Sequence, residues 1–339
     1  MRRLVAILAT VALAAVFLCP PPATADDPPT RSDLWAAIAA RALGRLVALD
    51  TGPALPASTL AYAAQATAWA SPSGWADPAA GALLTRLYAA ANPDGGYGLG
   101  VAYDAHQDGS VNPASTSYTV TMSGYVGPVL LDGMRAGVVP RAKVQAVFDL
   151  IATAPRIDTS AGRCVAYSRS ANDVGTGLCV HNVNASAAAF LLDAGADGFA
   201  VPWWLVQGIA KRELAAYNAT TRFWPYKDST SPTAQDADHN SYSTESMYTL
   251  AYPVAYSAAY VALTATPDGD PQTPVVYMRL AGLPAAPTAM SGPTTIWCLL
   301  GDTWIDDVDA WVTTNWSDTG RLAQAAYYAG RAARACEVL

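Results

Sequence analysis

A short polar motif that recurs along the chain constrains the fold more than any other feature of the sequence. An asparagine is followed, three and four residues later, by a pair such as Ser-Thr, as at Asn112, Asn182, Asn240 and Asn315. Leu55 stands where a first asparagine would be, so the motifs are spaced by 57, 70, 58 and 75 residues. Repetition at a spacing of this order indicates stacked copies of one supersecondary unit.

Each motif is followed by an apolar run suited to a helix, and then by a second, amphipathic run. A run that is apolar on all sides is typical of a buried helix, and an amphipathic run is typical of a helix that covers it. The sequence therefore predicts an all-α fold, an α/α toroid of about five to six helical hairpins with an inner ring of parallel helices. The first runs are 118–134, 185–192 and 247–263, and the second runs are 77–91, 142–152, 203–217 and 275–280.

The motifs also predict where the functional face lies. Asparagine is a favoured helix N-cap, so the simplest interpretation is that each motif begins an inner helix and that all of them surround one mouth. Long polar connections enter this mouth, and loops of such length in a compact domain are usually functional. These loops are 92–111, 156–181, 217–239 and 290–315, within a single domain predicted over 26–339.

The first 25 residues have the order of a secretory signal peptide. Arg2 and Arg3 precede an apolar run over 4–19, and Ala23-Thr24-Ala25 forms a small-residue cleavage site before Asp26. A membrane anchor is the alternative, but this run is shorter than the ~20 residues needed to span a bilayer. We therefore expect a secreted, extracellular, monomeric protein without stable membrane insertion.

The mature chain is acidic. Removing Arg2 and Arg3 leaves 18 basic against 27 acidic residues, a net charge of −9. Such a surface repels polyanions, so nucleic acid is excluded as a partner and a glycan or another small polar substrate is expected.

Four cysteines remain after cleavage, and an even number in an oxidising compartment indicates two disulfides. Four cysteines can be connected in three ways, and we favour the one in which both disulfides are local in sequence. Zinc is the alternative, but the chain has no Cys-x-x-Cys pair, and we expect no metal and no cofactor. The predicted disulfides are Cys164–Cys179 and Cys298–Cys336.

The long loops hold all three histidines of the chain, His106, His181 and His239. A single loop histidine is usually a hydrogen-bonding residue. Two His-Asn pairs at helix starts that the motif makes equivalent, at His181 and His239, favour a role in a site instead. A helix N-terminus disfavours the imidazolium form, which leaves a neutral histidine able to accept a proton.

Carboxylates in the same loops permit glycoside hydrolysis, which needs an acid and a second carboxylate roughly 5–9.5 Å apart. In loop three the helix N-terminus should hold the aspartates ionised, so the proton donor is expected in loop one. Adjacent acids that bind calcium or face solvent are the alternative. The candidate catalytic residues are Asp104 and Asp108 from loop one, with Asp236, Asp238 and His239 from loop three.

Aromatic rings recur among these acids and amides, as is suited to stacking on sugar faces. Packing of the rings in the core is the alternative. The candidate substrate-binding residues are Tyr103, His106, Tyr167, His181, Asn182, Trp224, Tyr226, Asn240 and Trp304, with Trp224-Pro225-Tyr226 as a rigid platform.

The alternation of Gly/aromatic loop, acid, His-Asn and buried helix resembles the α/α-toroid proteins: six-hairpin glycosidases, toroid polysaccharide lyases and epimerases, and terpenoid cyclases. The lyases bind uronates and transfer protons with Asn, His and Tyr, and the resemblance implies such roles for Asn240, His239 and Tyr226, with Arg169. A basic patch for a uronate would come from Arg163, Arg169, Arg222 and Lys227.

The segment Asp94-Gly95-Gly96-Tyr97 resembles a structural element of the terpenoid cyclases, whereas Asp306-Asp307-Val308-Asp309 reverses their acid motif. The sequence thus favours a secreted carbohydrate-active enzyme, a glycoside hydrolase. The alternatives are a polysaccharide lyase or epimerase, a non-catalytic glycan-binding or cell-envelope protein, and a terpenoid cyclase-like protein. A catalytic mouth should contain two titratable groups within reach of one bond, and a binding protein should not.

Overall fold

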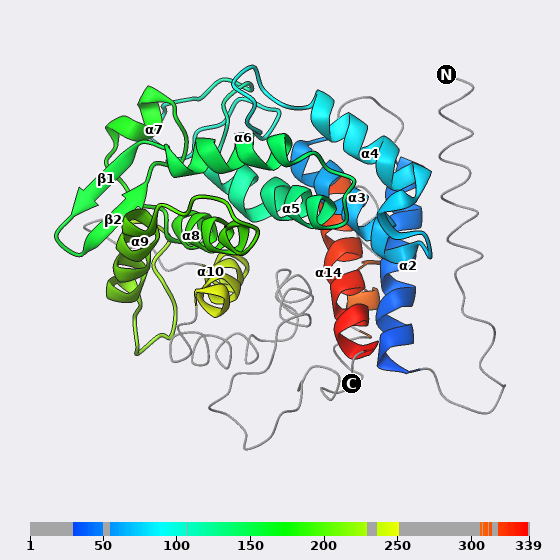
Figure 1. Ribbon diagram of the computed structural model, residues 1–339. Helices are drawn as coiled ribbons and strands as arrows, with labels where there is room; N and C mark the ends of the chain where they lie inside the picture. The colour runs from blue at the N-terminus through cyan, green and yellow to red at the C-terminus, as the bar shows by residue number, and fades with distance from the viewer. Residues whose placement is uncertain are drawn as a thin grey trace. The chain divides into compact units, whose positions relative to one another are not determined.

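Helices make up most of the computed structural model of the chain (Figure 1). It describes residues 30–49, 55–106, 108–228, 236–250, 306, 308–310, 312–313 and 318–337. Contacts divide the chain into two units. Unit 1 comprises residues 1–89, 274–285 and 292–339, and unit 2 comprises residues 90–273 and 286–291. The single domain over 26–339 stays a prediction, as does the signal peptide, which lies outside the described residues.

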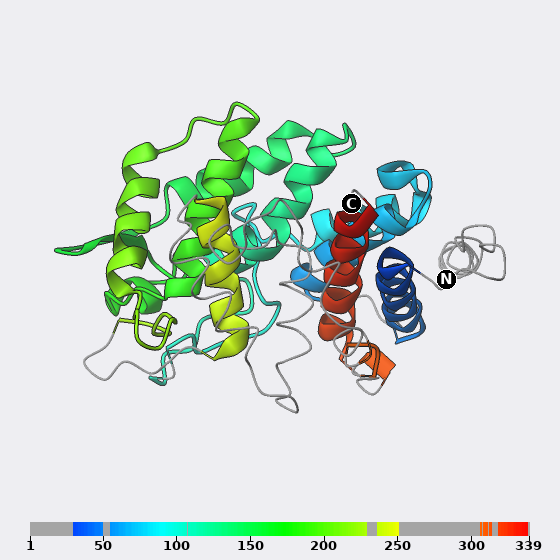
Figure 2. The ribbon, with the colours of Figure 1, turned by 90° about the horizontal axis from the view of Figure 1, so that it is seen from below.

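Unit 1 is a group of packed helices. α2 (Arg31–Leu49) lies along α14 (Thr319–Glu337), which also packs on α3 (Ala57–Ala70), and both ribbon views show α2 and α14 side by side (Figures 1 and 2). α3 is buried over most of its length, whereas α4 (Pro78–Ala89) buries one stripe. This pair therefore has the inner and outer character that the sequence predicted. A 3-10 turn, η1 (Gly74–Ala76), connects them.

The sequence analysis missed α2, although its start carries a recognisable signal. The Thr30 hydroxyl accepts from the Asp33 backbone N–H at 3.2 Å, and the Asp33 carboxylate accepts from the Thr30 N–H at 2.8 Å. This reciprocal pair satisfies two amides at the helix start.

Unit 2 repeats the hairpin arrangement. The first hairpin pairs η2 (Thr121–Val126) and α5 (Gly127–Arg135) with α6 (Arg141–Ala152). The second pairs α8 (His181–Ala196) with α9 (Trp203–Ala216), and α10 (Ala237–Thr249) packs on α8. α8 is buried on most sides because it packs against α9, α10 and η2. Gly127 of α5 also lets α8 approach closely, since a Cβ there would lie 2.7 Å from Phe190 Cε2.

The predicted runs agree well for the outer helices and unevenly for the inner ones, of which the run 118–134 corresponds to η2 and α5. The runs 77–91, 142–152 and 203–217 correspond to α4, α6 and α9. The run 185–192 lies inside α8, but α10 begins at Ala237, ten residues before the predicted 247–263. The first turns of α8 and α10 are polar, so apolar periodicity does not reveal them. Residues 251–263 and 275–280 lie outside the described residues.

Loop two contains a β-hairpin that the all-α prediction did not include. β1 (Arg156–Thr159) and β2 (Gly162–Val165) are antiparallel, and Ile157 pairs with Cys164. Gly162 makes the turn at φ +143°, where a side chain would also collide with the Gly208 carbonyl of α9. A short helix, α7 (Ala171–Gly175), follows the hairpin.

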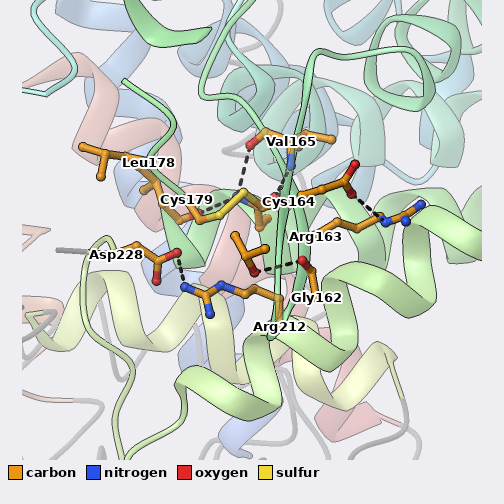
Figure 3. Close-up of a disulfide and its surroundings, with 12 residues drawn as sticks. Gly162, Arg163, Cys164, Val165, Leu178, Cys179, Arg212 and Asp228 are labelled. Carbon is orange, nitrogen blue, oxygen red and sulfur yellow. Dashed lines mark hydrogen bonds and ion pairs between the residues drawn. A yellow bond between two sulfur atoms is a disulfide. The ribbon is translucent and has the colours of Figure 1, made fainter. Parts of the chain in front are cut away.

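The disulfide Cys164–Cys179 is confirmed and ties β2 to the segment that precedes α8 (Figure 3). Both cysteines are fully buried. Cys298 and the side chain of Cys336 lie outside the described residues, so the Cys298–Cys336 disulfide stays a prediction.

Removing this disulfide should destabilise the protein. For the 15-residue separation, loop-closure entropy predicts a loss of about 3 kcal/mol in the free energy of unfolding for Cys164→Ala/Cys179→Ala. Urea denaturation of the wild type and of the double variant, both without reducing agent, measures this loss. A difference below about 1 kcal/mol would mean that the buried contacts of β2 hold the segment without the covalent link.

Among the described residues, no helix is long and apolar enough to cross a membrane.

Candidate functional site

Three helix starts of unit 2 lie together. The backbone N–H of Thr119 donates to the Tyr167 carbonyl at 2.9 Å, and that of His181 donates to the Tyr226 carbonyl at 3.1 Å. Each inner helix is thus joined to the tyrosine of the following loop. The first turn of α10 packs on the same segment, since the Tyr226 and His239 rings lie 5.1 Å apart. We call this end of unit 2, formed by the helix starts at 119, 181 and 237, the mouth.

Among the described residues, the motif asparagines Asn112, Asn182 and Asn240 are not helix caps, which corrects the sequence interpretation, and Asn315 lies outside the described residues. Asp236 caps α10, where its side chain accepts from the His239 N–H, and Val180 precedes α8 without a side-chain cap. Asn112 lies in an extended segment, where its amide donates to Asp173 at 3.0 Å.

Asn184 and Asn240 instead join each long loop to its helix. Asn184 Oδ1 accepts from the Val165 N–H at 2.7 Å, and Asn240 Oδ1 accepts from the Trp224 N–H at 3.0 Å. Both side chains also donate to the carbonyl of the residue before the helix. Both are the fourth residue of their helix, so Asn184, and not Asn182, is equivalent to Asn240.

Because Asn184 and not Asn182 is equivalent to Asn240, the sequence alignment of the two helices moves by two residues. His181 and His239, which the sequence paired, are therefore not equivalent. His181 is the first residue of α8 and is fully buried, whereas His239 is the third residue of α10 and its side chain is 36% exposed. Of these two, His239 is the histidine that a substrate can reach.

Tyrosines line the mouth. Tyr118 and Tyr167 form a buried cluster with Val180 and Val183, and Tyr103, Tyr125 and Tyr226 pack against it. Burial raises the pKa of Tyr226 to about 12 and the pKa of Tyr167 well above its ordinary value. These phenols are therefore neutral hydrogen-bonding groups on flat rings at physiological pH.

Asp236 and His239 form a carboxylate–imidazole pair at the edge of this lining. Nδ1 of His239 lies 2.8 Å from both carboxylate oxygens of Asp236, and the ring stands at 86° to that of Tyr226. Since a carboxylate accepts the Nδ1 proton, the lone pair of neutral His239 is on Nε2. The pair can therefore accept a proton at Nε2. Asp238 lies beside it, half-buried in the same helical turn.

The loop-one aspartates bind their own loop. The Asp104 carboxylate accepts from the N–H groups of His106, Asp108 and Gly109 at 2.7–3.3 Å. The side-chain hydrogen bond from Ser110 lowers the pKa of Asp108. Three amide donors hold the Asp104 carboxylate against its own loop. This arrangement does not suit the proton-donor role that the sequence analysis gave to Asp104 and Asp108.

His106 is a buried structural residue. Its Nε2 lies 3.6 Å from the Asp173 carboxylate, its ring stands edge-on to Tyr167, and its carbonyl accepts from Lys227 Nζ at 3.0 Å. It holds loop one against loop three, so it contributes to the shape of the mouth.

Trp224 also packs in the core and not as the expected open platform. It is 1% exposed, its Nε1 donates to the Glu213 carbonyl at 2.9 Å, and it packs on Tyr217. Asn182 is likewise buried. Trp304 lies outside the described residues.

The sequence analysis missed a buried charge network beneath the mouth. His181 Nδ1 lies 3.0 Å from Glu213, its Nε2 lies 3.1 Å from Asp228, and Asp228 pairs with Arg212 (Figure 3). Burial alone would lower the pKa of His181, but Glu213 and Asp228 raise it to about 9. Burial would raise the pKa of Asp228, but hydrogen bonds from His181 and Arg212 hold it at about 2. Burial raises the pKa of Glu213, and His181 offsets part of that rise.

The sequence could have indicated Glu213 only through its place on the buried face of α9, beside Leu205, Val206 and Ile209. A charged residue on such a face needs a charged partner. Which residue is the partner depends on the packing of α8 against α9.

The basic patch expected for a uronate is not assembled. Arg169 donates to the Leu150 carbonyl at 3.1 Å and to Thr153, and Arg163 pairs with Asp158. Lys227 is bound to His106, and Arg222 is exposed in the turn after α9. This is a finding against the lyase role that the resemblance implied for Arg169.

Asp94-Gly95-Gly96-Tyr97 is a structural turn. Asp94 accepts from the Gly96 N–H and the Ser117 hydroxyl, and the Tyr97 carbonyl accepts from the Tyr118 N–H. Gly95 has φ +82°. The segment therefore fastens loop one to the start of an inner helix.

Over the part of the chain that the structure describes, no group of three or more His, Cys, Asp and Glu side chains is placed to hold a metal ion. Cys164 and Cys179 are bonded to each other, which removes them as zinc ligands.

No protein-family model matches the sequence, and no curated protein matches it either. The fold, however, is similar to that of a solved structure, an α-1,6-mannanase of Salegentibacter sp. HEL1_6 in complex with α-1,6-mannotriose, inactivated by replacing two consecutive aspartates with asparagine. The TM-score is 0.56 at 10% identity, covering 89% of this chain and 99% of the mannanase chain. The chain therefore has an α/α-toroid fold, as the sequence predicted.

Proposed function

We propose that this protein is a secreted glycoside hydrolase that acts on an uncharged extracellular glycan at the mouth of unit 2. The observation that supports it most is the likeness, over nearly the full length of both chains, to a mannanase that binds a mannose oligosaccharide. The half-buried Tyr226, edge-on to His239 of the carboxylate–imidazole pair, is suited to bind a sugar hydroxyl, and the pair is suited to transfer a proton.

The residues proposed to carry the reaction are Asp236, Asp238 and His239. Asp236 orients His239, which accepts a proton from water at Nε2, and water then attacks the anomeric carbon as the glycosidic bond breaks. A carboxylic acid must protonate the leaving oxygen. We test Asp238, which is half-buried in the same helical turn as the pair, for this role.

The test is incubation of protein purified from the culture medium with an α-1,6-linked mannan, a β-linked glucan and polygalacturonate. New reducing ends on an uncharged polymer are the expected result. Retention on a glycan without any product would refute hydrolysis and favour a binding protein. An amino terminus at Asp26 would support export and cleavage.

Elimination by a lyase is a second candidate, because the Tyr226 and His239 rings are placed side by side as a proton donor and acceptor would be. Elimination needs a uronate substrate. Arg169 and Lys227, which would bind its carboxylate, instead donate to the carbonyl groups of Leu150 and His106. Ultraviolet absorbance from an unsaturated product with polygalacturonate would favour elimination over hydrolysis.

A further inference from the structure

Two adjacent tryptophans at the start of α9 are exposed. Trp203 is 55% exposed and Trp204 is 45% exposed, whereas the following Leu205 and Val206 are buried. Large aromatic rings gain several kcal/mol from burial, so a pair left open to solvent marks a contact surface.

Trp204 is held in a defined position by the β-hairpin. Arg156 and Arg163 lie on the same face of the hairpin, since Arg163 is opposite Asp158, two residues from Arg156. Their guanidinium carbons lie 4.8 and 5.0 Å from the centre of the Trp204 ring. Arg163 Nε is also 3.2 Å from Asp158. The Trp204 ring and the two guanidinium groups therefore form one ordered surface, with Trp203 next to it in the chain.

A glycine makes this surface possible. A Cβ on Gly208 would lie 2.3 Å from Arg163 Cγ, so the hairpin can cross α9 only where that side chain is absent. The exposed Gln207 lies one helical turn from Trp203 and adds an amide to the same side of α9.

This surface is separate from the mouth. Glu213, at the other end of α9, contacts His181 at the start of α8. Ten residues of helix separate Trp203 from Glu213, which is about 15 Å at 1.5 Å per residue. One sugar unit cannot reach both places, but a polysaccharide can.

We propose that Trp203 and Trp204, with Arg156 and Arg163, form a second carbohydrate-binding site that takes a short stretch of an uncharged polysaccharide. The Trp203 ring stacks on the C–H face of a sugar, and the guanidinium groups, which cover part of the Trp204 ring, donate their N–H groups to hydroxyls. Two rings surrounded by charged and amide side chains are too small an apolar surface for a stable protein interface, but they fit one or two sugars. The choice of a polysaccharide as ligand rests on the proposed function.

Native electrophoresis through gels that contain the α-1,6-linked mannan or the β-linked glucan tests the site without requiring catalysis. Wild type should be retarded by one of them, and Trp203→Ala should weaken that binding about tenfold, equal to 1.4 kcal/mol. Tyr248→Ala, which removes a ring on α10 that is also 45% exposed, is the matched control and should not change retardation. Trp203→Ala should raise KM for the polymer and leave kcat on a short oligosaccharide unchanged.

The outcomes separate this site from the proposed activity. Retardation that persists in His239→Ala and falls in Trp203→Ala supports the second site, even if no hydrolysis is ever found. Retardation that Trp203→Ala and Trp204→Ala leave intact would overturn it. So would retardation only by polygalacturonate, or a change of oligomeric state in light scattering on replacing Trp203, which would indicate a protein contact. Absence of retardation by both uncharged polymers would also overturn it.

Discussion

Replacing His239 with alanine is expected to lower turnover of the glycan substrate by about 10²–10⁴-fold, the usual contribution of a general base. The free energy of unfolding should hardly change, because the ring is partly exposed and its recorded contacts are those to Asp236 and Tyr226. Steady-state kinetics and urea denaturation of the purified variant measure the two effects.

Asp236→Asn separates the two roles of Asp236. Asparagine is as good an N-cap as aspartate, so α10 should keep its stability. The charge that orients and supports the His239 imidazolium is lost, so turnover should fall by about 10²-fold or more. Asp77→Asn is the matched control, since Asp77 accepts from the Ala79 N–H at the start of α4. It should leave turnover unchanged.

Full activity of both His239→Ala and Asp236→Asn on an identified substrate would show that the reaction is not carried by this pair. A loss of turnover in Asp238→Asn would then assign the reaction to Asp238. If the α10 variants fail to fold while Asp77→Asn folds, the first turn of α10 is structural.

The second large effect is expected in the buried charge network. Glu213→Gln removes one carboxylate from around a fully buried His181, and breaking a buried ion pair in this way typically costs about 3–5 kcal/mol. A double-mutant cycle with His181→Gln should show that the two losses are far from additive. Asp193→Asn, which breaks the half-exposed pair with Arg135, is the control and should cost less than about 1 kcal/mol. Equal losses of unfolding free energy in Glu213→Gln and Asp193→Asn would show that the buried pair contributes no more than the half-exposed one.

The same network predicts a pH dependence of stability. The pKa of His181 rises from its usual 6.5 to about 9 in the folded protein, so its contribution is full below about pH 6.5 and is lost as the pH passes 9. A shift of this size corresponds to about 3 kcal/mol of stabilisation. The raised pKa of Glu213 reduces this stabilisation, because it reflects the cost of burying the ionised carboxylate. The free energy of unfolding should fall between pH 7 and 10 in the wild type and much less in His181→Gln. A flat wild-type profile would mean that His181 is neutral in the folded protein.

Much of the fold follows from local patterns in the sequence. The outer helices α4, α6 and α9 were predicted within about two residues, because each has one apolar stripe and a polar face. The pairing of Cys164 with Cys179 also followed from their closeness in sequence. The spacing of the motifs indicated hairpins whose starts meet at one mouth, and this holds for the three helix starts of unit 2.

What lies at the mouth was decided by tertiary structure. The sequence places Asp104, Trp224 and His181 in polar loops. It does not show that Asp104 accepts from backbone N–H groups of its own loop, or that Trp224 and His181 are buried. The equivalence of Asn184 with Asn240 likewise appears only from their bonds to Val165 and Trp224. Periodicity is a property of neighbouring residues and can be read from the sequence. Burial and side-chain pairing depend on residues distant in sequence, and for these loops only the packing of α8 against α9 and α10 determines which side chains face a substrate.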